Sequence, residues 1–265
     1  MTKQPISLTP EEVRVLARCS LHYHFMQQGT DQPKSLEATL EMLVRDAIQQ
    51  LHAAGGPARL SRRECLAQVA AHPMARQMVA HYYDRLKQDW SQMMAGNETL
   101  TLKISIGGIP VQLSGTLDRL DKTSDGGILA ILFRTETGPL PTAAELRRDH
   151  AMTIYHALVA ANYPHKRPVR LQELWLSTDQ SVTIELSEEE YRQNLGHLRE
   201  PVRALARGEV MARPGLHCDI CPFKHRGCPV YTHETHGAGT QNEADDLDSS
   251  SQPGKIPPRK WVFKI

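Results

Sequence analysis

One segment near the middle of the chain constrains the fold more than any other, because it reads as a strand buried on both faces. Residues 128–135 (ILAILFRT) are almost all apolar, as in a central strand that helices cover on either side. The preceding segments 99–106 and 109–120 flank Gly107-Gly108 and are expected to form a β-hairpin. Asp125-Gly126-Gly127 supplies the turn into the buried strand. The sequence therefore predicts an α/β protein with a mixed central sheet flanked by helices.

The rest of the chain divides into three parts by pattern. Residues 1–96 are expected to form an N-terminal helical region, 97–232 the sheet-containing core, and 233–265 a disordered, polar tail with a basic and aromatic end. The expected helices run from about residue 9 past Leu21, over 35–54, from Ser61, from Pro73, over 142–162 and from Ser187 to near Gly208, with further strands at 169–177 and 181–186.

Charge and hydropathy narrow the class of partner. Lys and Arg number 31 against 30 Asp and Glu, a net charge of +1, so a nucleic-acid partner would have to meet a local basic patch. No segment has the roughly 18 consecutive apolar residues of a membrane span. The first residues carry acids where a signal peptide would be cationic and then apolar. We expect a soluble, cytoplasmic protein.

The five cysteines suggest a metal centre in a reducing compartment. Cys218, Cys221 and Cys228 lie in HCDICPFKHRGCPV, where the C-x2-C spacing lets two thiolates converge on one centre. Cys19, far upstream, is the candidate fourth ligand and would join the N-terminal helices to the end of the domain. An iron–sulfur cluster, a zinc site and structural thiols all remain open on spacing alone. Cys65 is expected to be a free thiol. Histidines that could complete a zinc site are His217, His225 and His233.

The segment GTLDRLD (115–121), the buried strand after it and the cysteine layout together resemble one nuclease family. This is the RecB-like branch of the PD-(D/E)XK nuclease superfamily, which includes AddB-type helicase–nuclease subunits. The resemblance covers roughly residues 10–231. It implies a restriction-endonuclease-like fold and a C-terminal end stapled by a [4Fe–4S] cluster, with zinc as the alternative. The implied cluster ligands are Cys19, Cys218, Cys221 and Cys228.

The resemblance also implies a catalytic site, which this sequence keeps only in part. Asp118 matches the first metal-binding aspartate, but the second carboxylate falls at Leu132 and the catalytic lysine at Arg134. The upstream helix position falls near Glu41, and the tyrosine after the core is kept as Tyr155. Leu132 offers no oxygen to a metal, and an arginine cannot act as a base. The implied site is therefore degenerate.

Two other interpretations of these residues are possible. Glu136 shares a strand face with positions 132 and 134 and could replace the missing carboxylate, so that Asp118 and Glu136 would hold Mg²⁺ or Mn²⁺. It lies four residues past the expected position, about 13 Å along an extended strand, which is too far for a simple substitution. Asp118 could instead be structural, paired with Arg119 or Arg134.

Basic residues supply candidate nucleic-acid contacts. Arg199, Arg203 and Arg207 recur every four residues on one helix face, and Lys224 and Arg226 lie inside the cysteine loop. The alternative is a solvated face paired with local acids. A further basic stretch contains Arg147, Arg148, Lys166, Arg167 and Arg170.

The chain's last segment, IPPRKWVFKI, allows two interpretations. It could dock on a partner through Trp261 and Phe263, or add a strand to the protein's own sheet.

These observations favour a catalytically degenerate nuclease-like protein. It would bind DNA, as single strands or strand ends, or scaffold a repair, recombination or defence complex beside a helicase or nuclease partner. One alternative is an active Mg²⁺- or Mn²⁺-dependent DNA exonuclease with a rearranged site. The other is an interaction module that carries a metal cluster and contacts no nucleic acid.

Overall fold

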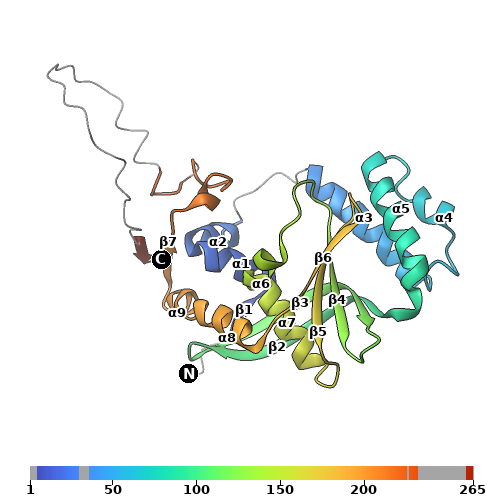
Figure 1. Cartoon of the computed structure of the whole chain (residues 1–265). Helices are drawn as coiled ribbons and strands as arrows, with labels where there is room; N and C mark the ends of the chain where they lie inside the picture. The colour runs from blue at the N-terminus through green and yellow to red at the C-terminus, as the bar shows by residue number, and fades with distance from the viewer. Residues whose placement is uncertain (1–4, 30–35, 226, 232–260, 265) are drawn as a thin grey trace, which may run out of the picture.

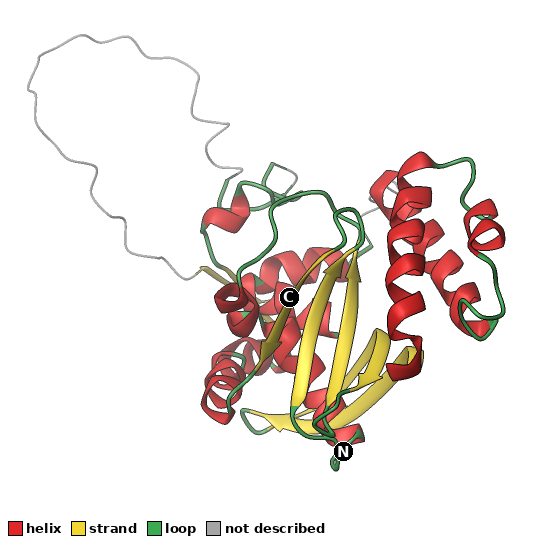
Figure 2. Ribbon diagram, turned by 45° about the vertical axis from the view of Figure 1, so that its right-hand side comes forward, coloured by secondary structure: helices red, strands yellow, loops and turns green. Residues whose placement is uncertain are grey.

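Six strands form one mixed sheet, which organises most of the chain (Figures 1 and 2). The computed structural model describes residues 5–29, 36–225, 227–231 and 261–264. β3 is central: β2 runs antiparallel along one of its edges, and β1 and β4 share the other. β4 and β5 pair in parallel, and β6 closes the far edge. The strands are β1 (Ile6–Leu8), β2 (Met93–Ile106), β3 (Ile109–Lys122), β4 (Ile128–Arg134), β5 (Val169–Trp175) and β6 (Gln180–Glu185).

Nine α-helices surround this sheet in the described part of the chain: α1 (Pro10–Arg18), α2 (Ser20–Gln27), α3 (Leu36–Ala53), α4 (Arg62–Ala67), α5 (Pro73–Asp89), α6 (Ala143–Arg148), α7 (His150–Asn162), α8 (Glu188–His197) and α9 (Arg199–Ala206). Four of them begin with a capping box, in which a Ser or Thr and the Glu three residues later satisfy each other's backbone N–H groups. The four N-caps are Thr9, Ser61, Thr142 and Ser187. None of the described helices has the length and apolarity to span a bilayer.

Both faces of β4 are covered, as its apolar sequence predicts. Ala130 and Leu132 belong to the core shared with α1, α7 and α9, whereas Ile131 and Phe133 belong to a second core built with α3, α4 and α5. Figures 1 and 2 show these two helical groups on opposite sides of the sheet. The expected α/β architecture with a mixed, helix-flanked sheet is confirmed. The first 96 residues also contribute β1 and the start of β2, beyond the helices expected there.

Three helices predicted to be continuous are each divided in two. Cys19 adopts an extended conformation (φ −159°, ψ 108°) between α1 and α2, so it lies at a break and not inside a helix. The Asp149 carboxylate accepts the N–H groups of Ala151 and Met152 and so starts α7 afresh. Pro201, in the first turn of α9, has no N–H to continue the helix from α8.

A buried ion pair lies between the sheet and the α3–α5 layer. The Arg119 Nε and Asp121 Oδ1 atoms are 2.6 Å apart, and both side chains are almost fully buried. A second Arg119 nitrogen donates to the Asp89 carbonyl at the end of α5. Two of the charged residues of GTLDRLD therefore fasten the helical region to β3.

The C-terminal part of the described chain returns to the first helices. β7 (Glu209–Ala212) exchanges two hydrogen bonds with the side chain of Ser20, through Met211 N and Met211 O. β8 (Trp261–Lys264) pairs antiparallel with β7. Of the two interpretations of the chain's end, the added strand is therefore correct for residues 261–264, although its partner is β7 and not the main sheet. The disorder expected between 233 and 260 falls outside the described residues.

Candidate active-site cleft

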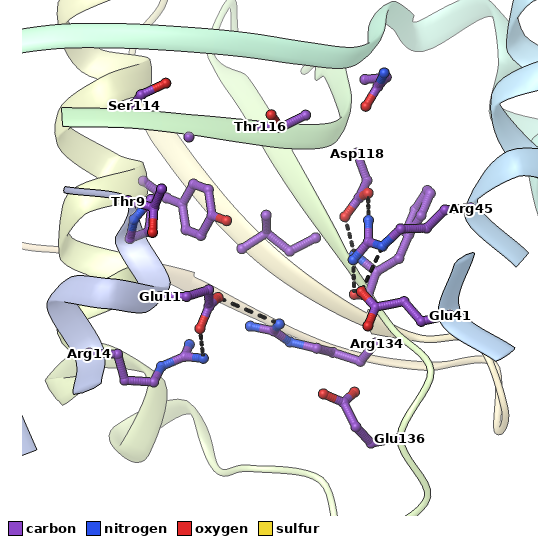
Figure 3. A pocket seen from close by; sticks show the side chains of 16 residues that line it. Thr9, Glu11, Arg14, Glu41, Arg45, Ser114, Thr116, Asp118, Arg134 and Glu136 are labelled. Carbon is purple, nitrogen blue, oxygen red and sulfur yellow. Dashed lines mark hydrogen bonds and ion pairs between the residues drawn. The ribbon is translucent and has the colours of Figure 1, made fainter. Parts of the chain in front are cut away.

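The cleft opens where one edge of β3 lacks a partner strand. β1 pairs with Val111–Leu113 and β4 pairs with Arg119–Lys122, so none of the described strands lies beside the intervening residues 114–118 on this edge. A cavity of about 630 Å³ occupies the gap (Figure 3). Its lining comes from α1, α3, α7, β3 and β4, and includes Glu41, Asp118, Arg134, Glu136 and Tyr155. The implied site residues are thus brought to one place.

Asp118 is held firmly at the point where β3 and β4 separate. The ladder between these strands stops at the Arg119–Ile131 pair. One Asp118 oxygen then accepts the backbone N–H of Phe133 at 2.7 Å, and its side chain is only 10 % exposed. The carboxylate fills the fork between the strands and presents its other oxygen to the cleft.

That other oxygen is bound by Arg45, a residue that the sequence analysis did not single out. The Arg45 guanidinium donates to Asp118 through Nη1 and to Glu41 through Nε, at 2.8 Å for the latter. Its Nη2 also donates to the Phe133 carbonyl at 3.2 Å. Figure 3 shows the guanidinium between the two carboxylates. Asp118 therefore pairs with neither Arg119 nor Arg134, contrary to the structural alternative considered for it.

The residues present do not fit the divalent metal that the resemblance implies. The guanidinium holds a positive charge where Asp118 and Glu41 would need to share a cation, and Leu132 contributes no oxygen. Among the described residues, no group of three His, Cys, Asp or Glu side chains is arranged to hold a metal ion. Glu136 lines the same cavity, but β4 ends at Arg134, so Glu136 does not continue the strand face that was expected to carry it.

Arg134 pairs with Glu173, an acid that the sequence analysis did not single out. Its Nε donates to Glu173 at 2.9 Å, and the Glu173 side chain is 5 % exposed. Burial acts to lower the pKa of Arg134, but the Glu173 carboxylate outweighs it and raises that pKa above its ordinary value. The available signal was a lone acid in the apolar strand VRLQELW. Its meaning depends on the β4–β5 register, which places Glu173 beside Leu132.

Ion pairs continue from Glu173 across the floor of the cleft. Arg14 lies within 4.0 Å of Glu173 and donates through Nε to Asp149 at 2.8 Å. Glu11 contacts Arg14 and lies 3.8 Å from Arg134 (Figure 3). Each arginine that lines the cavity is therefore already paired with acids.

Tyr155 reaches the cleft from α7 and is uncharged. Its side chain is buried, and burial, reinforced by the Glu11 charge, raises the pKa of Tyr155 to about 12. The phenol therefore keeps its proton at neutral pH and can donate a hydrogen bond.

The four cysteines proposed as ligands share a second location. Cys19, Cys218, Cys221 and Cys228 all line one small cavity of about 20 Å³ with Phe223. Burial raises the pKa of Cys221 and of Cys228, and the charges of neighbouring cysteine thiols raise both further. The break between α1 and α2 brings Cys19 there, with its Sγ 3.7 Å from the Met211 carbonyl.

The remaining cysteine lies apart from this group. Cys65 is fully buried in the core around α3–α5, and burial raises the pKa of its thiol to about 11. All five cysteines are free. The other four thiols line one cavity, although as they lie in the described chain they are not arranged around a metal ion. Cys65 is positioned as a packing residue.

Most of the basic residues proposed to bind nucleic acid make local contacts. Arg203 Nε donates to the Gly107 carbonyl at 2.7 Å, and Arg207 pairs with Glu209 at 2.6 Å. Lys224 pairs with Asp219 at 2.9 Å and lies over the Tyr231 ring. Arg199 is exposed beside the β2–β3 turn. Arg226 falls outside the described residues.

In the other basic stretch, three arginines also form local ion pairs or hydrogen bonds. Arg170 pairs with Asp125 at 2.7 Å, Arg147 lies 3.9 Å from Glu190, and Arg167 donates to the Ala160 carbonyl. Two of these three arginines pair with local acids, and the third is bonded to a backbone carbonyl.

Comparison with known proteins gives a family match across most of the chain. A family model described as the PD-(D/E)XK nuclease superfamily matches residues 7–229. The crystal structure of a protein designated SSO0001 has a TM-score of 0.46 and 13 % identity, covering 87 % of this chain and 89 % of that one. A candidate exonuclease from Eubacterium rectale has a TM-score of 0.46 and 10 % identity, covering 76 % and 80 %. No curated protein matches the sequence significantly.

Proposed function

The chain belongs to the PD-(D/E)XK nuclease superfamily. We propose that it is a member that binds nucleic acid and does not catalyse metal-dependent hydrolysis. It would belong to the RecB-like branch and act in a cytoplasmic repair, recombination or defence complex with a helicase or nuclease partner. Its ligand would be DNA, as single strands or strand ends.

The observation that carries this proposal is the position of Arg45. The guanidinium bonds both Asp118 and Glu41, so a divalent ion could reach the two carboxylates only by displacing it. Displacement would break a partly buried, charge-assisted contact and bring the ion against a cation of like charge. Hydrolysis by this superfamily needs a metal at such carboxylates to polarise the phosphate, and the arginine stabilises the carboxylates in its place.

The former lysine position supports the same conclusion. Arg134 is half-buried and paired with the buried Glu173, and an arginine in this environment neither accepts a proton from water nor turns readily toward a substrate. Asp118 on β3 and Arg134 on β4 are therefore both engaged in ion pairs and are not free to act in hydrolysis. Apart from the exposed Glu136, the residues left to contact a ligand directly are neutral and polar.

The cleft keeps the means to bind a sugar–phosphate chain. Ser114, Thr116 and Asn97 line it, together with the protonated phenol of Tyr155. Hydroxyl and amide groups of this kind donate to phosphate and sugar oxygens without reading the bases. The chain's own residues would thus bind and orient a strand without cleaving it.

We further propose that Cys19, Cys218, Cys221 and Cys228 hold a [4Fe–4S] cluster, with zinc as the alternative. The support is their convergence on one cavity from segments about two hundred residues apart. When bound, the cluster would supply a thiolate-bound link between the α1–α2 break and the C-terminal loop.

A cleavage and binding assay tests the proposal. Cluster-loaded protein, purified without oxygen, is incubated with end-labelled single-stranded DNA and Mn²⁺. We expect salt-dependent binding and no Mn²⁺-dependent cleavage. Cleavage that Asp118→Ala abolishes would instead establish the active exonuclease, with Glu136 as its third carboxylate. Absence of any DNA binding would favour the module that contacts no nucleic acid.

A further inference from the structure

Four basic residues from distant parts of the chain meet at the C-terminal end of α1. Arg18 is the last residue of α1, His150 is the first of α7, and His197 is the last of α8. Arg213 follows β7 directly. Figure 1 shows α1, α9 and β7 gathered in this part of the molecule. These four residues are called the α1-end cluster below.

Direct contacts connect some members of the cluster. The ring centroids of His150 and His197 are 6.1 Å apart. Arg213 Nη1 donates to the carbonyl of Ala17 at 3.2 Å, which places this guanidinium beside the last turn of α1. Burial lowers the pKa of His150; the adjacent Asp149 charge opposes this, and His197, Arg18 and Arg213 lower the pKa further. His150 is therefore uncharged at neutral pH, and the positive charge of the cluster lies on Arg18 and Arg213.

Nearby acids do not fully compensate this charge. Asp149 is shared with Arg14 at 2.8 Å, and Glu200 pairs with Arg213 at 3.3 Å. The exposed Arg18 guanidinium forms no hydrogen bond or ion pair within the described chain, and His150 Nε2 is buried without a hydrogen-bond partner. The unpaired Arg18 guanidinium, with Arg213 close by, would be stabilised by an anion that binds beside it.

The cluster also continues the cleft. Arg14, which lines the cleft, lies one helical turn before Arg18 on the same face of α1. The two positions are separated by about 6 Å along the helix axis, a step that a single extended nucleotide can span. Cys19 follows Arg18 directly, so the cysteine site holds this end of α1 in place.

We propose that the α1-end cluster binds phosphodiester groups of a nucleic-acid strand that passes from the cleft along α1 toward the cysteine site. This inference rests on the proposed function and adds the path of the strand to it. Arg18 would make the main contact, and Arg213 and the two histidines would line the path.

The test uses the full-length, cluster-loaded protein and a fluorescent dT oligonucleotide at several salt concentrations. Arg18→Gln is expected to weaken binding roughly tenfold, as loss of one charge-assisted contact does. The slope of log K against log salt should shrink by about 0.7, the value for one phosphate contact on a single strand. Arg18→Glu should weaken binding more, and Arg63→Gln, an exposed arginine on α4, should leave it unchanged.

Histidine NMR signals give a second readout that does not depend on a variant. The oligonucleotide should shift the ring signals of His150 and His197 and leave that of exposed His165 in place. If the wild-type chain binds DNA and both Arg18 variants bind equally well with the same salt slope, the path along α1 is wrong and the proposed function stands. If the wild-type chain binds no DNA, the proposed function fails, and this inference fails with it.

Discussion

Leu132 and Glu173 are register partners in the parallel β4–β5 pair, and their side chains lie on the same face of the sheet. The acid of this region therefore stands one strand away from the position at which the family resemblance expects a carboxylate. It is buried and pairs with Arg134, so it does not substitute for a metal ligand. It balances the charge of Arg134, which stands where the resemblance expects a lysine.

Removing one partner of the Glu173–Arg134 pair should destabilise the protein, whereas replacing both partners with apolar residues should not. Glu173→Ala leaves a guanidinium with 15 % exposure without its main partner, and we expect the free energy of unfolding to fall by about 3–5 kcal/mol. Urea denaturation measures this. The double variant Glu173→Leu, Arg134→Met should recover most of the loss. Glu185→Ala, which removes an exposed partner of Arg170, should cost less than about 1 kcal/mol; an equal cost for the two single variants would contradict this account.

Removing the resident cation should make the cleft receptive to a metal. In Arg45→Gln, Asp118 and Glu41 lose the guanidinium that bridges them. Repulsion between a unit charge and a divalent ion about 4 Å away is about 2 kcal/mol even in water, so Mn²⁺ affinity should rise more than tenfold. Titration calorimetry with Mn²⁺ measures the change, with Arg63→Gln as control. Equally tight Mn²⁺ binding by the wild-type chain would show that Arg45 does not guard the site.

Two half-buried histidines, each with a buried Nδ1 atom, should make the fold sensitive to mild acid. Burial lowers the pKa of His52 to about 4 and that of His156 to about 4, against 6.5 in the unfolded chain. As the pH falls below 6.5 the unfolded state binds protons first, so stability is complete above that pH and declines toward pH 4. Each histidine should cost about 2 kcal/mol between pH 7 and pH 5.

Urea unfolding of single variants at the two pH values checks this prediction. His52→Gln and His156→Gln should each reduce the difference in unfolding free energy between pH 7 and pH 5. His165→Gln removes an exposed histidine and should leave the difference as it is. A difference that none of the three variants alters would assign the acid sensitivity to other groups.

Metal content should differ between variants of the four site cysteines and a variant of Cys65. Protein purified without oxygen should carry about four irons per chain, and Cys19→Ser and Cys221→Ser should lose them together. Cys65→Ala should keep them, because Cys65 lies in a separate core. Iron, sulfide and zinc analysis measures all three variants. One zinc per chain in the wild type would overturn the cluster assignment and leave the four ligands unchanged.

Local patterns were sufficient to predict most of the fold. The uninterrupted apolar run at 128–135 indicated β4, and Ser61 and Ser187 marked helix starts that the structure confirms. β1 was missed because three residues carry too little pattern to reveal a strand. The break at Cys19 was missed because the apolar spacing of α1 and α2 is nearly continuous.

From the sequence, only those residues of the cleft could be predicted that match positions in the family pattern. Glu41, Asp118 and Tyr155 do line one cavity. Arg45 and Glu173 were missed because their roles depend on tertiary contacts: Arg45 meets Asp118 across 73 residues of sequence, and Glu173 meets Arg134 across 39. No local pattern reports which strand lies next to β4 or which turn of α3 faces β3.

The pairing of β8 with β7 has a practical consequence for anyone who shortens this protein. β7 is only four residues long and has β8 as its partner strand. A chain ending near residue 232 would expose the backbone donors and acceptors of that strand, and exposed edges recruit other strands. Removing residues 233–265 to aid crystallisation would therefore favour self-association beside the cysteine site.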